Sequence, residues 1–334
     1  MELSTIERPS PEFIPSQQAS AGRPAQLRLF DVPVPVDLRK FGDRVRASAL
    51  GDPKKRPIVV LGGISADCFP SIRPDGSSGW WAQLVGDGQA INSKEFYIIG
   101  IDFAADDTGK AAPSTIDQAR VLAATLDTIG VGQPAVFLGA SYGGMVALAL
   151  AKAEPQRVDK LVLVCAAHEP HPASTASREL QRRVVSLGLL AGRGDEALAI
   201  ARGMAMLTYR TPNEFEQRFE GGITEASPLC CSKPGEYLRA RGQAFRSVMS
   251  PGRFLSLSAS IDRHNVDVSD ISAPCLIIGA ESDQLVLSGQ LRELATKLDR
   301  SDLHLLDSLY GHDMFLKEAK RIGEIIGRFL ATDR

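Results

Sequence analysis

The chain of 334 residues carries a formal net charge of -2, with 44% hydrophobic and 23% charged residues, which is the composition of a globular protein. This near-neutral balance gives no electrostatic field that would favour nucleic acid or a membrane surface, so we expect a small-molecule partner. No apolar run reaches the roughly 18 residues of a membrane span, and no secretory signal pattern opens the chain, which together predict a cytoplasmic protein.

The five cysteines do not make a disulfide framework in a chain of this length. Cys165 and Cys275 lie in apolar runs and are predicted to be small core residues, whereas Cys68 is expected to be a free thiol. The adjacent Cys230 and Cys231 suit neither the spacing of a metal site nor a bridge to each other. The sequence therefore predicts no metal site.

Residues 1–25 are rich in proline, serine, glutamine and glutamate, and they are predicted to form a disordered arm. Beyond them, short apolar runs alternate with helical patterns. Strands are expected at 27–30, 44–47, 56–61, 96–103, 134–138 and 158–167, and helices at 115–129 and 144–153. This alternation predicts an α/β fold with a doubly wound, mostly parallel sheet.

The alternation breaks at about residue 168, after which the pattern stays helical to residue 262. Helices are expected at 174–190, 195–209, 212–219 and 235–257, the last as one or two helices. So long an insertion without strands predicts a helical cap over the edge of the sheet. Strands at 273–280 and 303–306 and a helix at about 317–331 then complete a core formed by residues 26–167 and 263–334.

A glycine-flanked serine follows the predicted strand at 134–138. Gly139, Ser141 and Gly143 have the G-x-S-x-G spacing of a nucleophile elbow, in which a sharp strand-to-helix turn exposes the serine hydroxyl. Glycine is expected at both flanking positions because a Cβ there would clash with the crowded turn. The apolar strand before the motif and the alanine-rich helix after it favour this interpretation over an ordinary glycine-serine turn.

The strand at 56–61 runs into a glycine pair, Gly62 and Gly63, at the end where an open α/β sheet places ligand-facing backbone. In a hydrolase-type site, one oxyanion N–H comes from such a loop and the other from the residue after the nucleophile. The predicted oxyanion donors are therefore the backbone N–H groups of Gly63 and Tyr142.

A serine needs a base and an orienting carboxylate, in the chain order Ser, then Asp or Glu, then His. Asp283 and His312 each follow a predicted strand and are the expected acid and base. Glu281 is the competing acid, although it lies closer to the strand end than a triad acid usually does. Asp313 is assigned to substrate binding, because sequence neighbours rarely point correctly for a triad.

The other four histidines have weaker cases for function. His168 and His171 open the cap on the expected active-site side, and a solvated loop is the favoured interpretation for both. His304 alternates with apolar residues and is expected at the surface, while His264 is expected in a polar turn without a role.

Several stretches of the chain resemble the homoserine O-acyltransferase branch of the α/β-hydrolase family. The resemblance extends over about residues 58–330, and its most specific stretches are Gly-Trp-Trp at 79–81 and Gly-His-Asp-Met-Phe-Leu at 311–316. Further likenesses are the stretches at 82–91, 139–145, 199–202, 207–209, 237–242 and 278–283.

This resemblance implies acyl transfer from an acyl-coenzyme A to the hydroxyl of L-homoserine, a step toward methionine, through a serine acyl-enzyme with ping-pong kinetics. It implies substrate-binding roles for Arg202, Tyr209 and Asp313. A guanidinium and a carboxylate suit a zwitterionic amino acid. It also implies a homodimer formed through the cap, with acyl-CoA as co-substrate and no separate cofactor.

Three departures from the family pattern leave the acyl donor and acceptor open. Tyr142 replaces a methionine, the segment at 102–113 is short, and the glycine loop reads Leu-Gly-Gly-Ile-Ser-Ala. Acetyl-CoA is the first expectation for the donor and succinyl-CoA a close second, with L-serine as an alternative acceptor. A serine hydrolase with the same triad, or a binding protein with this fold, are the competing hypotheses.

Overall fold

The computed structural model describes residues 27–219 and 232–332. The predicted arm at residues 1–25 and the cysteines at 230 and 231 lie outside the described residues. Within the described ranges, no helix combines the length and the apolar character needed to cross a membrane.

The described chain forms one sheet. Its strands in chain order are β1 (Leu27–Pro33), β2 (Arg44–Leu50), β3 (Arg56–Leu61), β4 (Phe96–Ile101), β5 (Ala135–Ala140), β6 (Val158–Val164), β7 (Cys275–Ala280) and β8 (Ser301–Leu306). Their spatial order is β1-β2-β4-β3-β5-β6-β7-β8, with β1 and β2 antiparallel to their neighbours and the pairs from β4 to β8 parallel. This confirms the α/β fold with a mostly parallel sheet.

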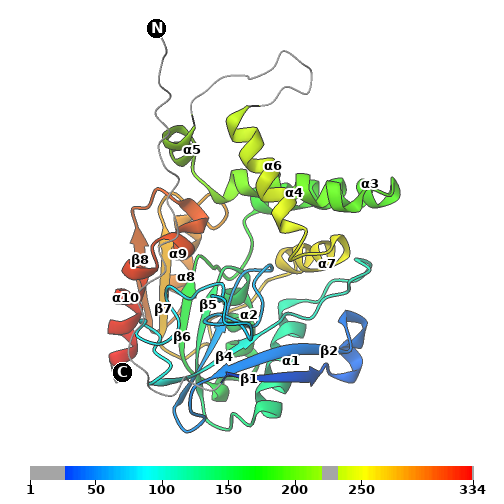
Figure 1. The fold of residues 1–334 in the computed structure, drawn as a ribbon. Helices are drawn as coiled ribbons and strands as arrows, with labels where there is room; N and C mark the ends of the chain where they lie inside the picture. The colour runs from blue at the N-terminus through cyan, green and yellow to red at the C-terminus, as the bar shows by residue number, and fades with distance from the viewer. Residues whose placement is uncertain (1–26, 220–231, 333–334) are drawn as a thin grey trace.

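Helices lie between the strands and after them (Figure 1). The α-helices are α1 (Thr115–Ile129), α2 (Tyr142–Ala153), α3 (Pro172–Leu190), α4 (Gly194–Tyr209), α5 (Pro212–Arg218), α6 (Lys233–Phe245), α7 (Pro251–Asp262), α8 (Ser288–Lys297), α9 (Met314–Lys317) and α10 (Ala319–Ala331). Short 3-10 helices are η1 (Val36–Phe41), η2 (Pro155–Arg157) and η3 (Gly311–Asp313).

The two faces of the sheet bury separate apolar clusters because side chains alternate along each strand. On β5, Phe137 packs in one cluster with residues of α1, α2 and α8, whereas Leu138 packs in the other with residues of α10 and with Trp81. Strands buried on both faces read as continuous apolar runs, and this is why the parallel strands could be predicted from the sequence.

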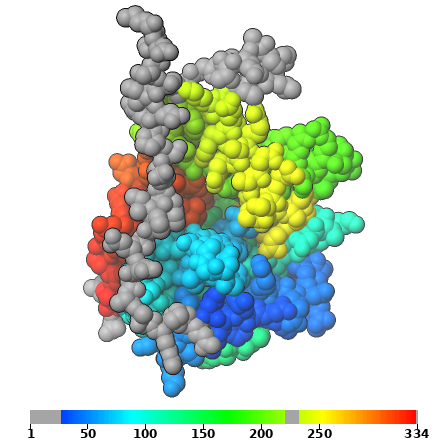
Figure 2. Space-filling model, viewed as in Figure 1, coloured from blue at the N-terminus to red at the C-terminus, as the bar shows by residue number. Residues whose placement is uncertain are grey.

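Helices α3 to α7 follow one another between β6 and β7 and gather on one side of the sheet (Figure 1). We call this segment, residues 172–262, the cap. In the space-filling view the cap, green to yellow, forms the upper part of the visible face above the blue and cyan core (Figure 2). The expected helix at 235–257 is two helices, since Pro251 begins a new helix behind an N-cap at Ser250.

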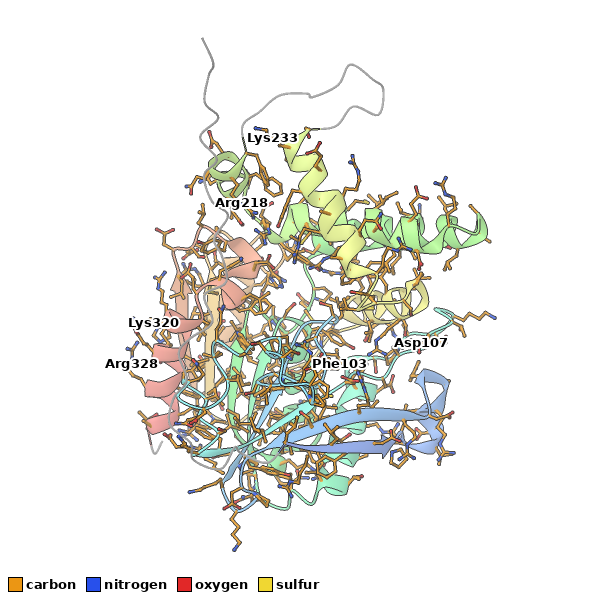
Figure 3. The ribbon with its side chains drawn as sticks, in the orientation of Figure 1. Phe103, Asp107, Arg218, Lys233, Lys320 and Arg328 are labelled. Atoms are coloured by element: carbon orange, nitrogen blue, oxygen red, sulfur yellow. The ribbon has the colours of Figure 1, made fainter. Side chains whose placement is uncertain are left out.

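The cap is tied to the core along the loop that follows β4. Phe103 and Asp107, labelled in Figure 3, lie beneath α7. The Arg253 guanidinium donates to the Phe103 carbonyl oxygen at 2.7 Å, and the backbone of Gly252 approaches Asp107 so closely that a Cβ would lie 1.8 Å from its carbonyl oxygen. The short segment at 102–113 therefore packs against α7 of the cap.

Candidate active site

Ser141 lies on a tight turn between β5 and α2, with a positive φ of 53°. This turn is sterically possible because Gly139 and Gly143, on either side of the serine, have no side chains. A Cβ on Gly139 would lie 2.4 Å from the Gly144 nitrogen, and one on Gly143 would lie 2.4 Å from the Leu61 carbonyl oxygen. The predicted steric need for glycine at both flanking positions is confirmed.

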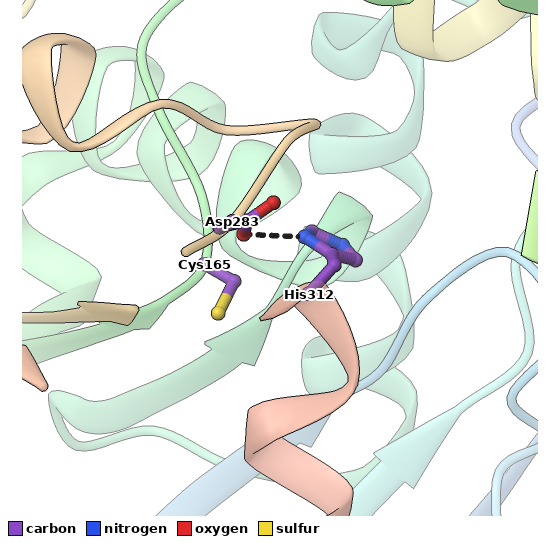
Figure 4. Close-up of side chains that lie close together, drawn as sticks. All are labelled: Cys165, Asp283 and His312. Carbon is purple, nitrogen blue, oxygen red and sulfur yellow. Dashed lines mark hydrogen bonds and ion pairs between the residues drawn. The ribbon is translucent and has the colours of Figure 1, made fainter. Parts of the chain in front are cut away.

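A hydrogen-bonded chain links Ser141, His312 and Asp283. His312 Nδ1 lies 2.7 Å from Asp283 Oδ2, the dashed contact in Figure 4, and His312 Nε2 lies 2.9 Å from Ser141 Oγ. Because a carboxylate only accepts, Nδ1 carries the proton, and Nε2 of the neutral ring is left to accept from the serine hydroxyl. Asp283 Oδ1 also accepts from the backbone N–H groups of Leu285 and Val286, at 2.8 and 3.1 Å.

The environment of His312 favours its protonated form. Burial by itself opposes the charge, but the negative charge of Asp283 and its hydrogen bond outweigh burial and raise the pKa of His312 above the usual 6.5. A raised pKa makes the imidazole a stronger base toward the serine proton. Glu281, the competing acid, is exposed and forms an ion pair with Arg292 at 2.6 Å, so it takes no part in this chain.

Cys165 lies beside the same groups (Figure 4), with its sulfur, an Asp283 oxygen and a His312 nitrogen all within 4.8 Å of one another. Such a trio has the composition of a metal site. However, Asp283 Oδ2 and His312 Nδ1 already bond to each other at 2.7 Å, and burial raises the pKa of the Cys165 thiol well above its usual value. The arrangement favours hydrogen bonding over metal binding.

The loop that carries His312 is held by the Gly-Trp-Trp stretch. The Trp81 indole N–H donates to the Phe315 carbonyl oxygen at 2.8 Å, and the Trp81 ring lies edge-on to that of Phe315. Trp80 stacks on Trp81 with ring centroids 5.0 Å apart. The paired tryptophans pack on each other, and Trp81 fixes the segment that follows the histidine.

The glycine loop after β3 borders the serine. The Gly143 N–H donates to the Gly62 carbonyl oxygen at 2.9 Å, which clamps the loop against the elbow. Gly63 lines a cavity together with Ser141 and Tyr142. Tyr142 is the first residue of α2, where backbone N–H groups have no partner within the helix. Gly63 and Tyr142, the two residues predicted to donate to the oxyanion, therefore border the same cavity as Ser141.

The same cavity contains the three predicted substrate-binding residues, Arg202, Tyr209 and Asp313, beside Ser141 and His312. We call it the Arg202 cavity. The Arg202 guanidinium lies over the rings of Tyr209 and Phe245, 5.1 and 4.7 Å from their centroids. Across the described residues, no carboxylate forms an ion pair with Arg202. Its charge therefore faces the cavity without a carboxylate partner.

Asp313 is buried and lies 3.4 Å from Arg210, measured between Oδ2 and Nε. Burial raises the pKa of the Asp313 carboxyl, and the Arg210 charge opposes that rise. Arg210, the extended residue that follows α4, also pairs with the buried Glu214 of α5. Sequence reasoning missed this buried pair, for which the only signal was an Arg and a Glu four residues apart.

The Tyr142 side chain is buried between the core and the cap. Its hydroxyl bonds to Ser260 on α7, its ring lies edge-on to Phe103, and burial raises the pKa of its phenol to about 12. The residue that departs from the family pattern thus joins the elbow helix to the cap.

Two of the four remaining histidines differ from expectation. His168, expected in a solvated loop, is buried beside Lys297, with 2.9 Å between Nε2 and Nζ. His264, expected in a polar turn, is buried between Thr115 and the Ala167 carbonyl oxygen, and burial lowers its pKa to about 4. Both are enclosed by elements distant in sequence, which local pattern does not reveal.

A second cavity also borders the serine, and it was not predicted. It shares Ser141, Tyr209, Ile261 and His312 with the Arg202 cavity and adds Arg178 and Gln181 of α3. We call it the Arg178 cavity.

Comparison with known proteins places this geometry in context. Residues 56–319 match the family model described as the alpha/beta hydrolase fold. A homoserine O-succinyltransferase from Xanthomonas campestris pv. campestris is 37% identical over 294 residues, which cover 86% of this chain and 79% of that protein. A homoserine O-acetyltransferase from Thermus thermophilus is 30% identical over 306 residues, with coverage of 81% and 78%.

Solved structures share the fold at lower identity. A homoserine O-acetyltransferase from Bacillus anthracis superposes with a TM-score of 0.81 at 15% identity, covering 93% of this chain and 99% of that one. The esterase E22 superposes with a TM-score of 0.79 at 21% identity, covering 92% and 100%. Proteins with this fold include both acyltransferases and esterases, so the fold alone does not distinguish the two activities. The residues of the site are needed to distinguish them.

Proposed function

Because the chain belongs to the homoserine O-acyltransferase branch of the α/β-hydrolase fold family, we propose that it moves an acyl group from acyl-coenzyme A to the hydroxyl of L-homoserine. One observation carries the proposal. The Ser141–His312–Asp283 chain opens into a cavity that also holds Arg202, a guanidinium without a carboxylate partner among the described residues, and Asp313.

In the first half-reaction, Ser141 Oγ attacks the thioester carbonyl carbon while His312 Nε2 takes the hydroxyl proton. The carbon–sulfur bond breaks, His312 returns the proton to the departing sulfur, and coenzyme A leaves as its thiol. The backbone N–H groups of Gly63 and Tyr142 would stabilise the oxyanion of the tetrahedral intermediate. Asp283 keeps the imidazole in the required tautomer and stabilises its charged form.

In the second half-reaction, the homoserine hydroxyl attacks the ester carbon and gives its proton to His312, which passes it to the departing Ser141 oxygen. The products are O-acylhomoserine and the free enzyme, so the kinetics are ping-pong. We assign the homoserine carboxylate to Arg202 and its ammonium group to Asp313, with Tyr209 holding Arg202 in place. The reaction needs acyl-CoA as co-substrate and no separate cofactor or metal, and we place it in the cytoplasm, in methionine biosynthesis.

The relatives differ in acyl group and in acceptor. Their names include homoserine O-succinyltransferase, homoserine O-acetyltransferase, L-serine/homoserine O-acetyltransferase and serine O-succinyltransferase. Incubation with homoserine or serine and with acetyl-CoA or succinyl-CoA, followed by mass spectrometry of the products, identifies both substrates. O-acylhomoserine is the expected product, whereas free carboxylic acid as the main product would indicate a hydrolase.

The role of Arg202 is tested by Arg202→Met, which keeps an apolar stem against Tyr209 and Phe245 but removes the charge. We expect kcat/KM for homoserine to fall by about 100-fold or more, from loss of a charged hydrogen bond in a buried site, while acylation of Ser141 is retained. Arg193→Met, an exposed arginine at the start of α4 that pairs with Glu196, is the matched control. Equal loss of both half-reactions would show that Arg202 does not bind the acceptor.

A further inference from the structure

Four charged side chains of alternating sign lead from the Arg202 cavity into the cap. Asp313 lines the cavity, and its Oδ2 lies 3.4 Å from Nε of Arg210. Arg210 Nη1 pairs with Oε1 of Glu214 on α5, and the same oxygen accepts from Arg218 Nη1 at 3.1 Å. Arg218, labelled in Figure 3, is the last residue of α5. The site proposed for the amino acid is therefore continuous with a charged chain inside the cap.

The two inner members of this chain, Arg210 and Glu214, are buried without lining a cavity. Their side chains are 7% and 4% exposed, and neither residue borders the Arg202 cavity or the Arg178 cavity. A buried ion pair contributes little to stability compared with apolar packing of the same volume, because both charges must leave water. Since Asp313 is the one neighbour of this pair that reaches the cavity, any effect of the pair on a bound molecule acts through Asp313.

The contact between Arg210 and Asp313 is loose. Arg210 Nε is a buried donor without a hydrogen-bond partner among the described residues, and 3.4 Å is an ion-pair distance longer than a normal hydrogen bond. Arg210 makes its close contact with Glu214 instead. In the part of the chain that the structure describes, this loose ion pair is the one printed polar contact of the Asp313 carboxylate. Asp313 therefore keeps its capacity to accept hydrogen bonds from a ligand in the cavity.

The buried charges of the chain leave an excess of one negative charge. Asp313 and Glu214 each carry one negative charge and Arg210 one positive charge, whereas Arg218 is 40% exposed and screened by water. Without Glu214, Arg210 would cancel the charge of Asp313. Without Arg210, two neighbouring buried carboxylates would repel each other and favour protonation. Together the pair preserves a negative charge at the cavity, which suits an ammonium group.

The charges that surround Asp313 agree with this arrangement. Burial raises the pKa of the Asp313 carboxyl. Arg210 is the strongest of the charges that lower this pKa, followed by His312 and Arg202, and Glu214 raises it. Arg210 therefore does most to keep Asp313 ionised in a buried site.

The position of Arg210 is fixed relative to the loop that carries His312. The next residue, Thr211, donates from Oγ1 to the Leu309 carbonyl oxygen at 2.6 Å. The Arg210 guanidinium also lies over the ring of Tyr237 on α6, 5.5 Å from its centroid. The cation is thus held beside Asp313 by contacts on both sides.

We propose that Arg210 and Glu214 are a positioning pair that keeps Asp313 a carboxylate facing the cavity, and that the pair thereby selects an acceptor with a free α-ammonium group. This inference rests on the proposed transfer to an amino-acid hydroxyl. An acceptor whose amino group is blocked as an amide carries no positive charge there and would leave the buried negative charge without a partner. Homoserine therefore fits the site, and N-acetylhomoserine does not.

The pH dependence of the two half-reactions tests the pair in the full-length enzyme. In a ping-pong reaction, kcat/KM for acyl-CoA reports acylation and kcat/KM for homoserine reports transfer. Both half-reactions need neutral His312, but only transfer needs ionised Asp313. Arg210→Met leaves Asp313 beside Glu214 without a cation between them, which raises the pKa of Asp313 further.

For Arg210→Met we therefore expect transfer to be lost at a higher pH than in the unmodified enzyme as the pH falls. At neutral pH, kcat/KM for homoserine should be about 10- to 100-fold lower, the usual effect of losing an interaction with a charged group. The profile of kcat/KM for acyl-CoA should not change. Arg210→Lys keeps the charge and should restore the pH profile of transfer.

Glu214→Gln keeps the shape of the pair and should have a different effect. Arg210 then pairs with Asp313 alone and cancels its charge, so KM for homoserine should rise by about tenfold without a shift of the transfer profile to higher pH. Arg183→Met is the matched control, because it breaks an exposed pair with Glu179 on α3. It should change neither half-reaction.

The inference is overturned if Arg210→Met and Glu214→Gln impair both half-reactions equally, or if neither changes the use of homoserine. If Arg210→Met does not fold, Glu214→Gln and Arg210→Lys decide by the same criteria. Equal use of homoserine and N-acetylhomoserine by the unmodified enzyme would also contradict it. All of these results leave acyl transfer intact. An unmodified enzyme that transfers no acyl group to an amino acid would instead overturn the proposed function, and this inference with it.

Discussion

At the residue scale, the most specific prediction concerns the pH dependence of Ser141 acylation. His312 accepts the serine proton only when it is neutral, and the charge of Asp283 raises its pKa above 6.5. The acylation rate should therefore fall as the pH drops through the pKa of His312, which lies above 6.5. The rate should be maximal only at pH values above that pKa. The pH profile of kcat/KM for acyl-CoA measures this directly.

The substitution Asp283→Asn, compared with Glu281→Gln, tests which of the two candidate acids orients His312. It removes the charge that raises the pKa of His312 and favours the wrong tautomer, so we expect the acylation rate to fall by about 10⁴-fold. Glu281→Gln, which removes only an exposed partner of Arg292, should change the rate less than threefold, within about 0.6 kcal/mol of barrier. A larger effect of the Glu281 substitution would contradict the assignment.

The residues of the hydrogen-bonded chain were predictable because each follows a strand at the same edge of the sheet. Parallel strands bring Ser141, Asp283 and His312 together from three distant places in the sequence. Arg178 was not predictable in this way, because α3 comes to the cavity beside Ser141 only when the cap folds over the sheet. His264 shows the same limit, since its burial requires α1 and the end of β6 to close around it.

At the scale of elements, the elbow places a steric demand on its glycines that can be measured as stability. Gly143→Ala would put a Cβ against the Leu61 backbone, which cannot move without shifting β3, so we expect a loss of about 1–3 kcal/mol and a lower Tm. Gly327→Ala in α10 is the control. Nothing lies within 4 Å of its Cβ position, and alanine should stabilise that helix by up to about 1 kcal/mol. Equal Tm changes would show that crowding is not the reason for Gly143.

The elements that the sequence missed are short ones. Helix α8 was not predicted, because its apolar positions Leu291 and Leu294 are too few to establish a period. The strand expected at 158–167 ends at Val164, where Cys165 adopts a positive φ of 50° and turns the chain away from the sheet. Nothing in the residues at 165–167, all buried and apolar, signals that turn.

At the scale of the whole molecule, the expected homodimer remains a prediction, and the cap surface supports it. Large apolar side chains are exposed on the cap, among them Leu187 at 66% and Leu190 at 84% on α3. Replacing both with lysine should convert a dimer to a monomer in analytical ultracentrifugation. Ile116→Lys, at a similarly exposed position of α1 in the core, should not. A monomeric unmodified protein would contradict the prediction.

The central claim is that Ser141 carries an acyl group from coenzyme A to an amino-acid hydroxyl, and trapping and then chasing the acyl-enzyme tests it most directly. The enzyme is mixed with acyl-CoA alone, the modified residue is identified by peptide mass spectrometry, and homoserine is then added. We predict an ester on Ser141 that persists without acceptor and disappears on addition of homoserine, with O-acylhomoserine formed in equal amount. No ester on Ser141, or an ester lost to water equally fast with and without homoserine, would contradict the account.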